Sequence, residues 1–171
     1  MSEIKEHAIS LGDGYYLCLD RYNGYTMKEY EDKGKKVLRR ITGYSHELVD
    51  AIDECLERRI GEQAAKDLTD IKEAVMAMEK SIAKWSIKDD AKFGDGYQMN
   101  VDNFNNHFIT QDRGKRSDYR VSGYCNSNNA AIISLIRHTC MATEVSDLKG
   151  VKKLVKSINK DVNGWKKEVA Q

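Results

Sequence analysis

The sequence predicts an α+β fold made of two tandem βββαα units, one in each half of the chain. Three observations predict this fold: a Gly-Asp-Gly segment occurs twice, residues that alternate between apolar and polar follow each copy, and apolar stripes with helical spacing come next. The 171 residues suffice for one domain or for two small ones that share a core. We expect units at residues 1–85 and 93–171, joined by a short connector at 86–92 and packed as a pseudo-twofold pair.

The internal repeat extends well beyond the Gly-Asp-Gly segment. Residues 11–15 read LGDGY, and residues 93–97 read FGDGY. Later segments correspond in the same order, residues 32–36 with 112–116 and residues 40–44 with 120–124. Agreement at so many spaced positions indicates a fold that is duplicated within one chain.

Each unit is expected to begin with a three-stranded antiparallel meander. In the second unit, Tyr97, Met99 and Val101 alternate with polar residues, as expected for a strand that buries one face. A pair suited to the positive φ angles of a tight hairpin turn follows in each unit, Asn23-Gly24 and Asn105-Asn106. The remaining strands are expected at residues 25–30 and 37–42 in the first unit and at 107–111 and 119–122 in the second.

Two helices are expected after each meander. The first has an apolar stripe that should cover the sheet, formed by Leu48, Ile52, Cys55, Leu56 and Ile60 in one unit and by Ala131, Ile132, Leu135, Ile136 and Cys140 in the other. The second is expected to begin at an N-cap aspartate, Asp67 or Asp147. Its stripe ends on a tryptophan in both units: Ile71, Val75, Met78, Ile82 and Trp85 correspond to Val151, Val155, Ile158, Val162 and Trp165.

The sequence does not indicate an enzymatic, metal or cofactor site. The Gly-Asp-Gly segments precede strands, whereas a phosphate-binding loop opens a helix, so we expect simple turns at both. The histidines are dispersed and no nucleophile motif occurs. The scattered cysteines are expected to be reduced structural thiols: Cys18, Cys55, Cys125 and Cys140. The alternative, an enzyme, requires Asp, His or Cys side chains that converge in a cleft between the units.

Basic turns are the strongest signal for a binding function. The net charge of +1 excludes a globally basic nucleic-acid binder, but cations cluster at one turn of each unit and along the strand that follows. The candidate residues for binding a partner or nucleic acid are Lys33, Lys35, Lys36, Arg39, Arg40, Arg113, Lys115, Arg116 and Arg120. The alternative is a pair of solvated turns whose charges only maintain solubility.

Aromatic residues and a basic helix accompany these turns. Side chains that offer stacking surfaces near the turns are Tyr22, Tyr25, Tyr30 and Phe104. Tyr44 and Tyr124, each after a glycine at a strand-to-helix junction, are expected to be structural instead. The last helix is rich in lysine, which suits an acidic partner or a phosphate backbone, through Lys149, Lys152, Lys153, Lys156, Lys160, Lys166 and Lys167.

The chain is expected to be a cytoplasmic protein without a membrane partner. It contains no apolar run long enough to span a membrane, and its first residues lack the basic-then-apolar pattern of a secretory signal. The apolar stripe of the last helix is narrow, which argues against a role at a membrane surface.

The segment GDGYYLCLDRYNGY at residues 12–25, together with ITGY at residues 41–44 before a helix, resembles small phage and prophage proteins of Gram-positive bacteria. Within that group, the size, the balanced charge and the lack of a catalytic signature look like an anti-CRISPR inhibitor of a Cas9-type nuclease. The resemblance implies a non-enzymatic protein that binds the CRISPR effector nuclease with its guide RNA in the cytoplasm of the bacterial host. No concentrated acidic block exists to mimic DNA, so basic hairpins that contact the guide RNA fit better.

An alternative function uses the same basic turns without a protein partner. It is a phage accessory protein that binds the phosphate backbone of DNA or RNA. Counterion release makes such binding fall steeply with salt, whereas a contact centred on protein falls less.

Overall fold

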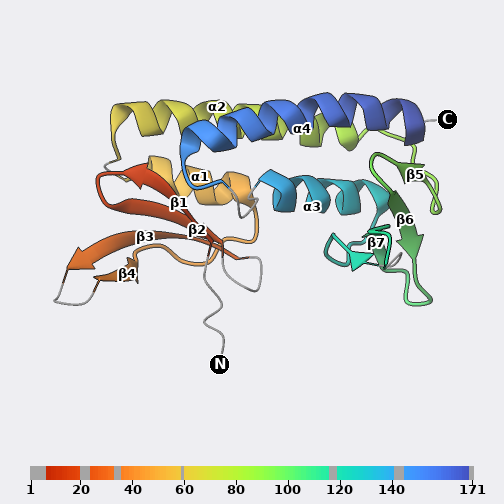
Figure 1. The fold of residues 1–171 in the computed structure, drawn as a ribbon, viewed down its shortest axis with the longest axis horizontal. Helices are drawn as coiled ribbons and strands as arrows, with labels where there is room; N and C mark the ends of the chain where they lie inside the picture. Colours follow the sequence, from red (N-terminus) through yellow and green to blue (C-terminus); the bar gives the residue numbers. More distant parts are fainter. Residues whose placement is uncertain are drawn as a thin grey trace. The chain divides into compact units, whose positions relative to one another are not determined.

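The protein has an α+β fold with the element order ββββααββββαα (Figure 1). The structure is a computed structural model that describes residues 7–19, 24–32, 36–58, 60–115, 119–140 and 145–169, with the backbone alone for 30–32 and 36–39. The first half contains β1 (His7–Gly12), β2 (Tyr15–Leu19), β3 (Tyr25–Asp32), β4 (Lys36–Arg40), α1 (Leu48–Leu56) and α2 (Glu62–Ile82). The second half contains β5 (Lys92–Phe93), β6 (Tyr97–Val101), β7 (His107–Gln111), β8 (Tyr119–Arg120), α3 (Asn128–Cys140) and α4 (Leu148–Val169).

The predicted βββαα order is wrong in its number of strands, because each half carries four strands before its two helices. The additional strands are β1 and β5, which form an edge of each sheet and precede the Gly-Asp-Gly turn. β5 has only 2 residues, too few for an alternating pattern to be recognised in the sequence. It begins at Lys92, the last residue of the predicted connector.

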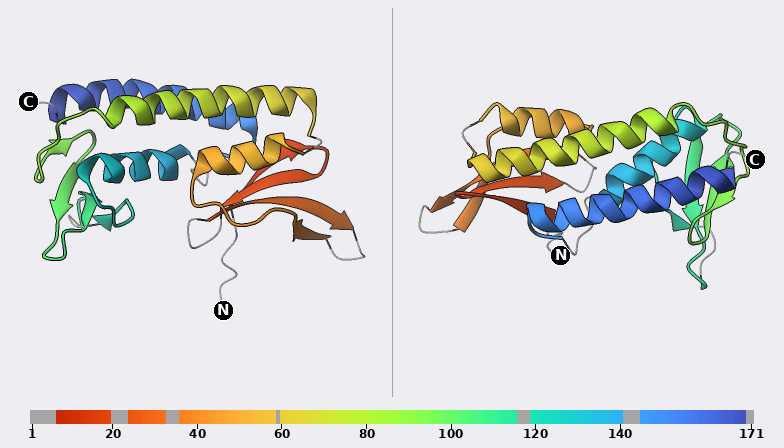
Figure 2. Two further views of the ribbon diagram at one scale, coloured as in Figure 1. Left: turned by 180° about the vertical axis from the view of Figure 1, so that it is seen from behind. Right: turned by 90° about the horizontal axis from the view of Figure 1, so that it is seen from above.

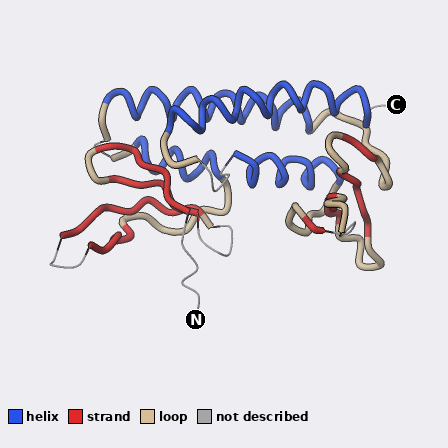
Figure 3. The backbone as a smooth tube through the Cα atoms, in the orientation of Figure 1, coloured by secondary structure: helices blue, strands red, loops and turns tan. Residues whose placement is uncertain are grey.

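Both sheets are antiparallel meanders in which each strand pairs with the next along the chain (Figure 3). In the first sheet Ile9, Leu17 and Met27 lie side by side across β1, β2 and β3, and all three are buried. In the second sheet Met99 pairs with Ile109, and both are buried. A short helix packs against each sheet, α1 against β3 and α3 against β7. Each sheet therefore has one apolar face, as the alternation predicts.

The short helices bury the predicted apolar stripes. Ile52 and Cys55 of α1, and Ile132 and Ile136 of α3, are 0% exposed. α1 ends at Leu56, so Ile60, which the stripe included, lies beyond the helix. Burial of one helical face against a sheet supplies most of the stabilisation of such short helices.

The long helices begin at different places relative to their predicted N-caps. Asp147 directly precedes α4, and its Oδ1 accepts a hydrogen bond from the Gly150 N–H at 2.7 Å, which confirms it as the N-cap. Asp67 is not an N-cap, because α2 already begins at Glu62. Residues 62–66 contain neither glycine nor proline, so nothing in the backbone prevents the helix from starting earlier.

Contacts group the chain into two compact units, residues 1–75 with 141–155 and residues 76–140 with 156–171. Each unit contains one sheet, one short helix and a segment of each long helix. Within each unit, the segments of α2 and α4 run alongside each other (Figure 2). The domain boundaries predicted from the repeat stay a prediction. No described helix is both long and apolar enough to cross a membrane.

Candidate nucleic-acid interface

The nine predicted binding residues are described to different extents. Lys33, Lys35 and Arg116 lie outside the described residues. Lys36 and Arg39 belong to β4, and only the backbone of these two residues is described. The remaining candidates have described and exposed side chains, namely Arg40, Arg113, Lys115 and Arg120. Two of these, Arg40 and Arg120, occupy equivalent places at the last residue of β4 and of β8.

Each of these two arginines lies over the ring of an exposed tyrosine. The Cζ atom of Arg40 is 4.6 Å from the ring centroid of Tyr44, and that of Arg120 is 4.2 Å from the ring centroid of Tyr124. The tyrosines are 56% and 59% exposed. We expected Tyr44 and Tyr124 to be structural residues, but the side chains of both are exposed and do not belong to the core. We call these the two arginine–tyrosine pairs, and at these distances the cation is attracted to the π face.

Backbone anchors on either side fix the loop that carries each tyrosine. In the first unit, the hydroxyl of Thr42 accepts a hydrogen bond from the buried N–H of Met27 at 2.8 Å. Ser45 then exchanges two backbone hydrogen bonds with Tyr25, of 2.7 and 2.9 Å. Gly43 and Tyr44 lie between these anchors and both are exposed. The loop is held at both ends while its tyrosine stays in solvent.

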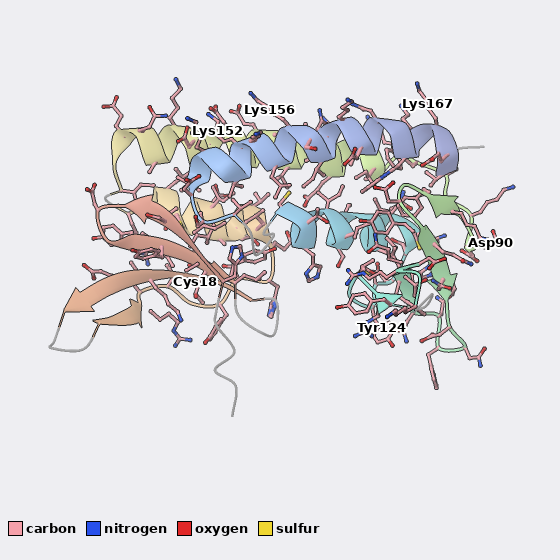
Figure 4. The ribbon with its side chains drawn as sticks, in the orientation of Figure 1. Cys18, Asp90, Tyr124, Lys152, Lys156 and Lys167 are labelled. Carbon is pink, nitrogen blue, oxygen red and sulfur yellow. The ribbon has the colours of Figure 1, made fainter. Side chains whose placement is uncertain are left out.

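The second unit repeats these anchors. The hydroxyl of Ser122 accepts a hydrogen bond from the N–H of Ile109 at 2.8 Å. Cys125 and His107 exchange two backbone hydrogen bonds, of 2.8 and 2.9 Å. The exposure of Tyr124 therefore has the same local cause as that of its counterpart. Figure 4 labels Tyr124 beside the strands of the second sheet.

The second unit extends its pair into a broader surface on the sheet. The ring of Phe108 meets that of Tyr124 edge-on, with centroids 5.3 Å apart. Strand register places Asn100, Phe108, Thr110 and Arg120 on the sheet face opposite the buried Met99 and Ile109, and the Asn100 Nδ2 donates to the Thr110 hydroxyl at 2.9 Å. We call the residues Asn100, Phe108, Thr110, Arg120 and Tyr124 the open face. It combines aromatic rings, an amide, a hydroxyl and a guanidinium.

The corresponding face of the first sheet is less open. Cys18 and Thr26 pair across β2 and β3 on the side opposite Leu17 and Met27, and they are 0% and 1% exposed. Their counterparts in the second sheet, Asn100 and Phe108, are only partly buried. The two units therefore share the arginine–tyrosine pair but differ in the surface that surrounds it.

Arg113 and Lys115 do not join the open face. The Arg113 Cζ is 3.8 Å from the ring centroid of Tyr119, and Tyr119 pairs with Gln111. Because neighbouring residues of a strand point to opposite faces, Tyr119 and Arg120 lie on different faces of the sheet. Lys115 is exposed in the turn between β7 and β8. Arg113, from the predicted basic turn, therefore lies over Tyr119 on the sheet face opposite the one that carries Arg120, the candidate on the strand that follows.

The basic helix α4 is partly neutralised. Lys152 Nζ lies 3.0 Å from Asp67 Oδ1 and 2.9 Å from Asp70 Oδ2, and hydrogen bonds to Asp70 and Asp67 raise the pKa of Lys152. The other lysines of α4 are exposed. Figure 4 shows Lys156 and Lys167 on the side of α4 that points away from the strands of their unit.

The structure confirms the prediction of simple turns at the Gly-Asp-Gly segments. Gly12, Asp13 and Gly14 have φ angles of 84°, 52° and 82°, and they connect β1 to β2 with no helix following. Among the described residues, no group of His, Cys, Asp and Glu is arranged to hold a metal ion. Burial raises the pKa of the Cys55 and Cys140 thiols to about 12, so neither is a thiolate near neutral pH.

Comparison with known proteins gives no assignment. No protein-family profile matches the chain, and neither a curated protein nor a solved structure shows significant similarity to it.

Proposed function

We propose that the protein acts by stoichiometric binding of a nucleic acid or a nucleoprotein, and not by catalytic turnover. The observation that carries the proposal is the exposed arginine–tyrosine pair, which occurs at equivalent places in both units as Arg40–Tyr44 and Arg120–Tyr124. The proposal includes the predicted tandem duplication and pseudo-twofold packing, in which the two pairs are copies of one binding element. The repeated anchors at Thr42 and Ser122 support this part.

The chemistry of the pairs suits unpaired bases next to a phosphate backbone. An exposed tyrosine ring offers a flat surface on which any base can stack, at about 1–3 kcal/mol per base. A guanidinium beside it can bind a phosphate through two parallel hydrogen bonds. Among the side chains that the structure describes, no ion pair engages Arg40 or Arg120. Their charge is therefore available to a partner.

The open face favours single-stranded nucleic acid over a duplex. Bases stacked inside a helix cannot reach Tyr124 and Phe108, whereas the splayed bases of RNA loops and ends can. Asn100 and Thr110 add hydrogen-bonding groups beside these rings. Guide RNA within a CRISPR effector carries such unpaired segments, and the resemblance to anti-CRISPR inhibitors makes the complex of a Cas9-type nuclease with guide RNA our leading proposal for the partner. Its cellular site is then the cytoplasm of the bacterial host.

The second candidate is a nucleic-acid-binding accessory protein of a phage, without a protein partner. The exposed lysines of α4 favour it, because they offer a further surface to a phosphate backbone. Affinity that falls steeply between low and physiological salt supports this candidate. A shallow dependence supports the nucleoprotein.

A DNA-cleavage reaction with a Cas9-type nuclease and guide RNA tests the leading proposal. The protein is titrated in before guide loading, after guide loading, and after DNA addition. Inhibition that saturates near one protein per nuclease is expected, and the most sensitive stage identifies the step that is blocked. Arg120→Gln should weaken inhibition, whereas Lys88→Gln removes an exposed charge outside the pairs and should not. No inhibition at large excess across several Cas9 types would overturn the leading proposal and leave the accessory protein.

A further inference from the structure

The turn between β6 and β7 presents the most exposed large apolar side chain among the described residues. Phe104 is 87% exposed, whereas the other exposed large apolar residues range from 39% to 59%. The turn projects from the end of the β6–β7 hairpin, beyond the strands of its sheet (Figure 2). Single exposed apolar residues are common on protein surfaces, so exposure alone assigns no role to Phe104.

A single carboxylate holds this turn in shape. The Asp102 Oδ1 accepts hydrogen bonds from the N–H groups of Phe104 and Asn106, at 2.9 and 3.0 Å, and its Oδ2 accepts one from the Asn106 Nδ2 at 3.0 Å. Two backbone hydrogen bonds of 3.1 Å close the turn further, from the Asn105 N–H to the Asp102 carbonyl and from the Asp102 N–H to the Asn106 carbonyl. The backbone on either side of the Phe104 ring is therefore fixed.

A fixed turn lowers the free-energy cost of binding through its aromatic residue. Ordering a loop at an interface costs free energy, and a turn that is already ordered avoids this cost. The two side-chain torsions of phenylalanine add little to it. Because Phe104 is almost fully exposed, most of the apolar surface of its ring is available for burial by a partner.

The sequence of this turn recurs in the first unit. Residues 20–23 read DRYN, where residues 102–105 read DNFN. Both copies have an aspartate, an aromatic residue two positions later and an asparagine after it. Residues 20–23 lie outside the described residues, so this comparison concerns the sequence alone. Recurrence of the aromatic residue points to a use of the ring, because Phe104 contributes nothing to the core of its own unit.

The charge of the turn favours a protein partner over nucleic acid. Residues 102–106 include no lysine or arginine. Hydrogen bonds from the side chain and the N–H of Asn106 lower the pKa of Asp102, so its carboxylate stays negative. Side chains that wedge between bases are accompanied by cations that contact phosphates. The predicted basic turn does not supply them here, because Arg113 and Lys115 lie at the opposite end of β7.

We propose that Phe104 inserts into an apolar pocket with a basic rim on the protein component of the nucleoprotein. This inference rests on the proposed function and deepens its nucleoprotein candidate. The hairpin that carries Phe104 also supplies Asn100 and Phe108 to the open face, so RNA bound at the open face brings its protein within reach of the turn. A negative turn suits the basic surface with which a protein holds RNA.

Affinity for the complex of a Cas9-type nuclease with guide RNA tests the inference, in parallel with affinity for the guide RNA alone. Phe104→Ser should weaken binding of the complex by about tenfold or more, because the apolar surface of the ring is no longer buried. Its affinity for the guide RNA alone should stay within about twofold of the wild type. Met76→Ser changes an exposed apolar residue of α2 and serves as the control, which should leave both affinities unchanged.

Two further measurements separate insertion into protein from stacking on a base. Phe104→Leu should retain most of the affinity for the complex, because leucine also fills an apolar pocket, whereas stacking on a base requires an aromatic ring. The photoreactive residue p-benzoylphenylalanine, incorporated in place of Phe104, should crosslink to the nuclease chain and not to the guide RNA.

Equal affinity of the wild type and Phe104→Ser for the complex would overturn the inference. A crosslink to the guide RNA, or an equal loss of affinity for the guide RNA alone, would overturn it as well. In these cases the proposed function stands, provided that Arg120→Gln still weakens inhibition. Absence of wild-type binding to the complex would instead overturn the nucleoprotein partner, and this inference with it.

Discussion

Ser122→Ala tests how the structure presents Tyr124. Ser122 is buried, and only 6% of the residue is exposed. Its hydroxyl accepts a hydrogen bond from the Ile109 N–H at 2.8 Å and donates one to the Gly123 carbonyl at 3.0 Å. The alanine variant leaves the buried N–H of Ile109 without an acceptor. It also releases one anchor of the loop that carries Tyr124. Stability and binding should therefore both fall.

The magnitude follows from the cost of an unsatisfied buried donor. That cost is about 1–3 kcal/mol, and each kcal/mol lowers the Tm of a protein of this size by about 2–4 °C. We therefore expect the Tm to fall by about 2–12 °C. The matched control is Ser157→Ala at an exposed position of α4, where alanine is at least as good a helix former.

Thermal unfolding followed by circular dichroism measures the loss, and hydrogen exchange of the Ile109 amide measures it locally. Thr42→Val in the first unit should have a similar effect, because it removes the acceptor of the Met27 N–H while keeping the shape of the side chain. A Tm equal to that of Ser157→Ala, or an Ile109 amide that stays as protected as in the wild type, would refute the reasoning.

Two further predictions concern stability. Gly94 has a φ of 54°, and a Cβ there would lie 2.6 Å from Trp165 Nε1, whereas Gly114 has a φ of 76° and open space around its Cα. A non-glycine residue in the left-handed conformation costs roughly 1–2 kcal/mol, so Gly114→Ala should lower the free energy of unfolding in urea by about that amount. Gly94→Ala should lower it by more, because its Cβ would also clash with Trp165. Equal losses in the two variants would contradict the predicted clash. Stability should also fall as the pH rises from about 9 towards about 12, because unfolded thiols ionise near 9.0 while burial holds Cys55 and Cys140 protonated. At pH 10 the loss should be about 1.4 kcal/mol per thiol relative to pH 8, and a Cys55→Ala/Cys140→Ala variant that retains the full pH dependence would contradict it.

The sequence predicts the repeated strands and helices well, because periodic burial leaves a local pattern. Met99, Ile109 and Ile132 lie in the core where alternation and helical spacing put them. The strands β1 and β5 were not predicted. Both lie at a sheet edge, where a strand pairs with only one neighbour. In addition, β5 has too few residues for an alternating pattern to be recognised. The start of α2 was misplaced because an aspartate within a helix and an N-cap aspartate look alike in sequence.

The candidate sites were harder to predict because they depend on contacts between distant residues. The exposure of Tyr44 follows from the bond between the Thr42 hydroxyl and the Met27 N–H, which no local pattern reveals. The only sequence signal was the recurrence of Arg, Gly and Tyr at residues 40–44 and 120–124.

Affinity for single-stranded RNA tests the proposed binding through the arginine–tyrosine pairs most directly. Fluorescence anisotropy with a labelled, unstructured RNA at fixed salt compares the wild type with Tyr44→Ser/Tyr124→Ser, and Met76→Ser serves as the control at an exposed apolar residue. Loss of two stacking surfaces should weaken binding by about tenfold or more, while the control stays within about twofold of the wild type. A double variant that binds as tightly as the wild type would contradict a role of these pairs in binding.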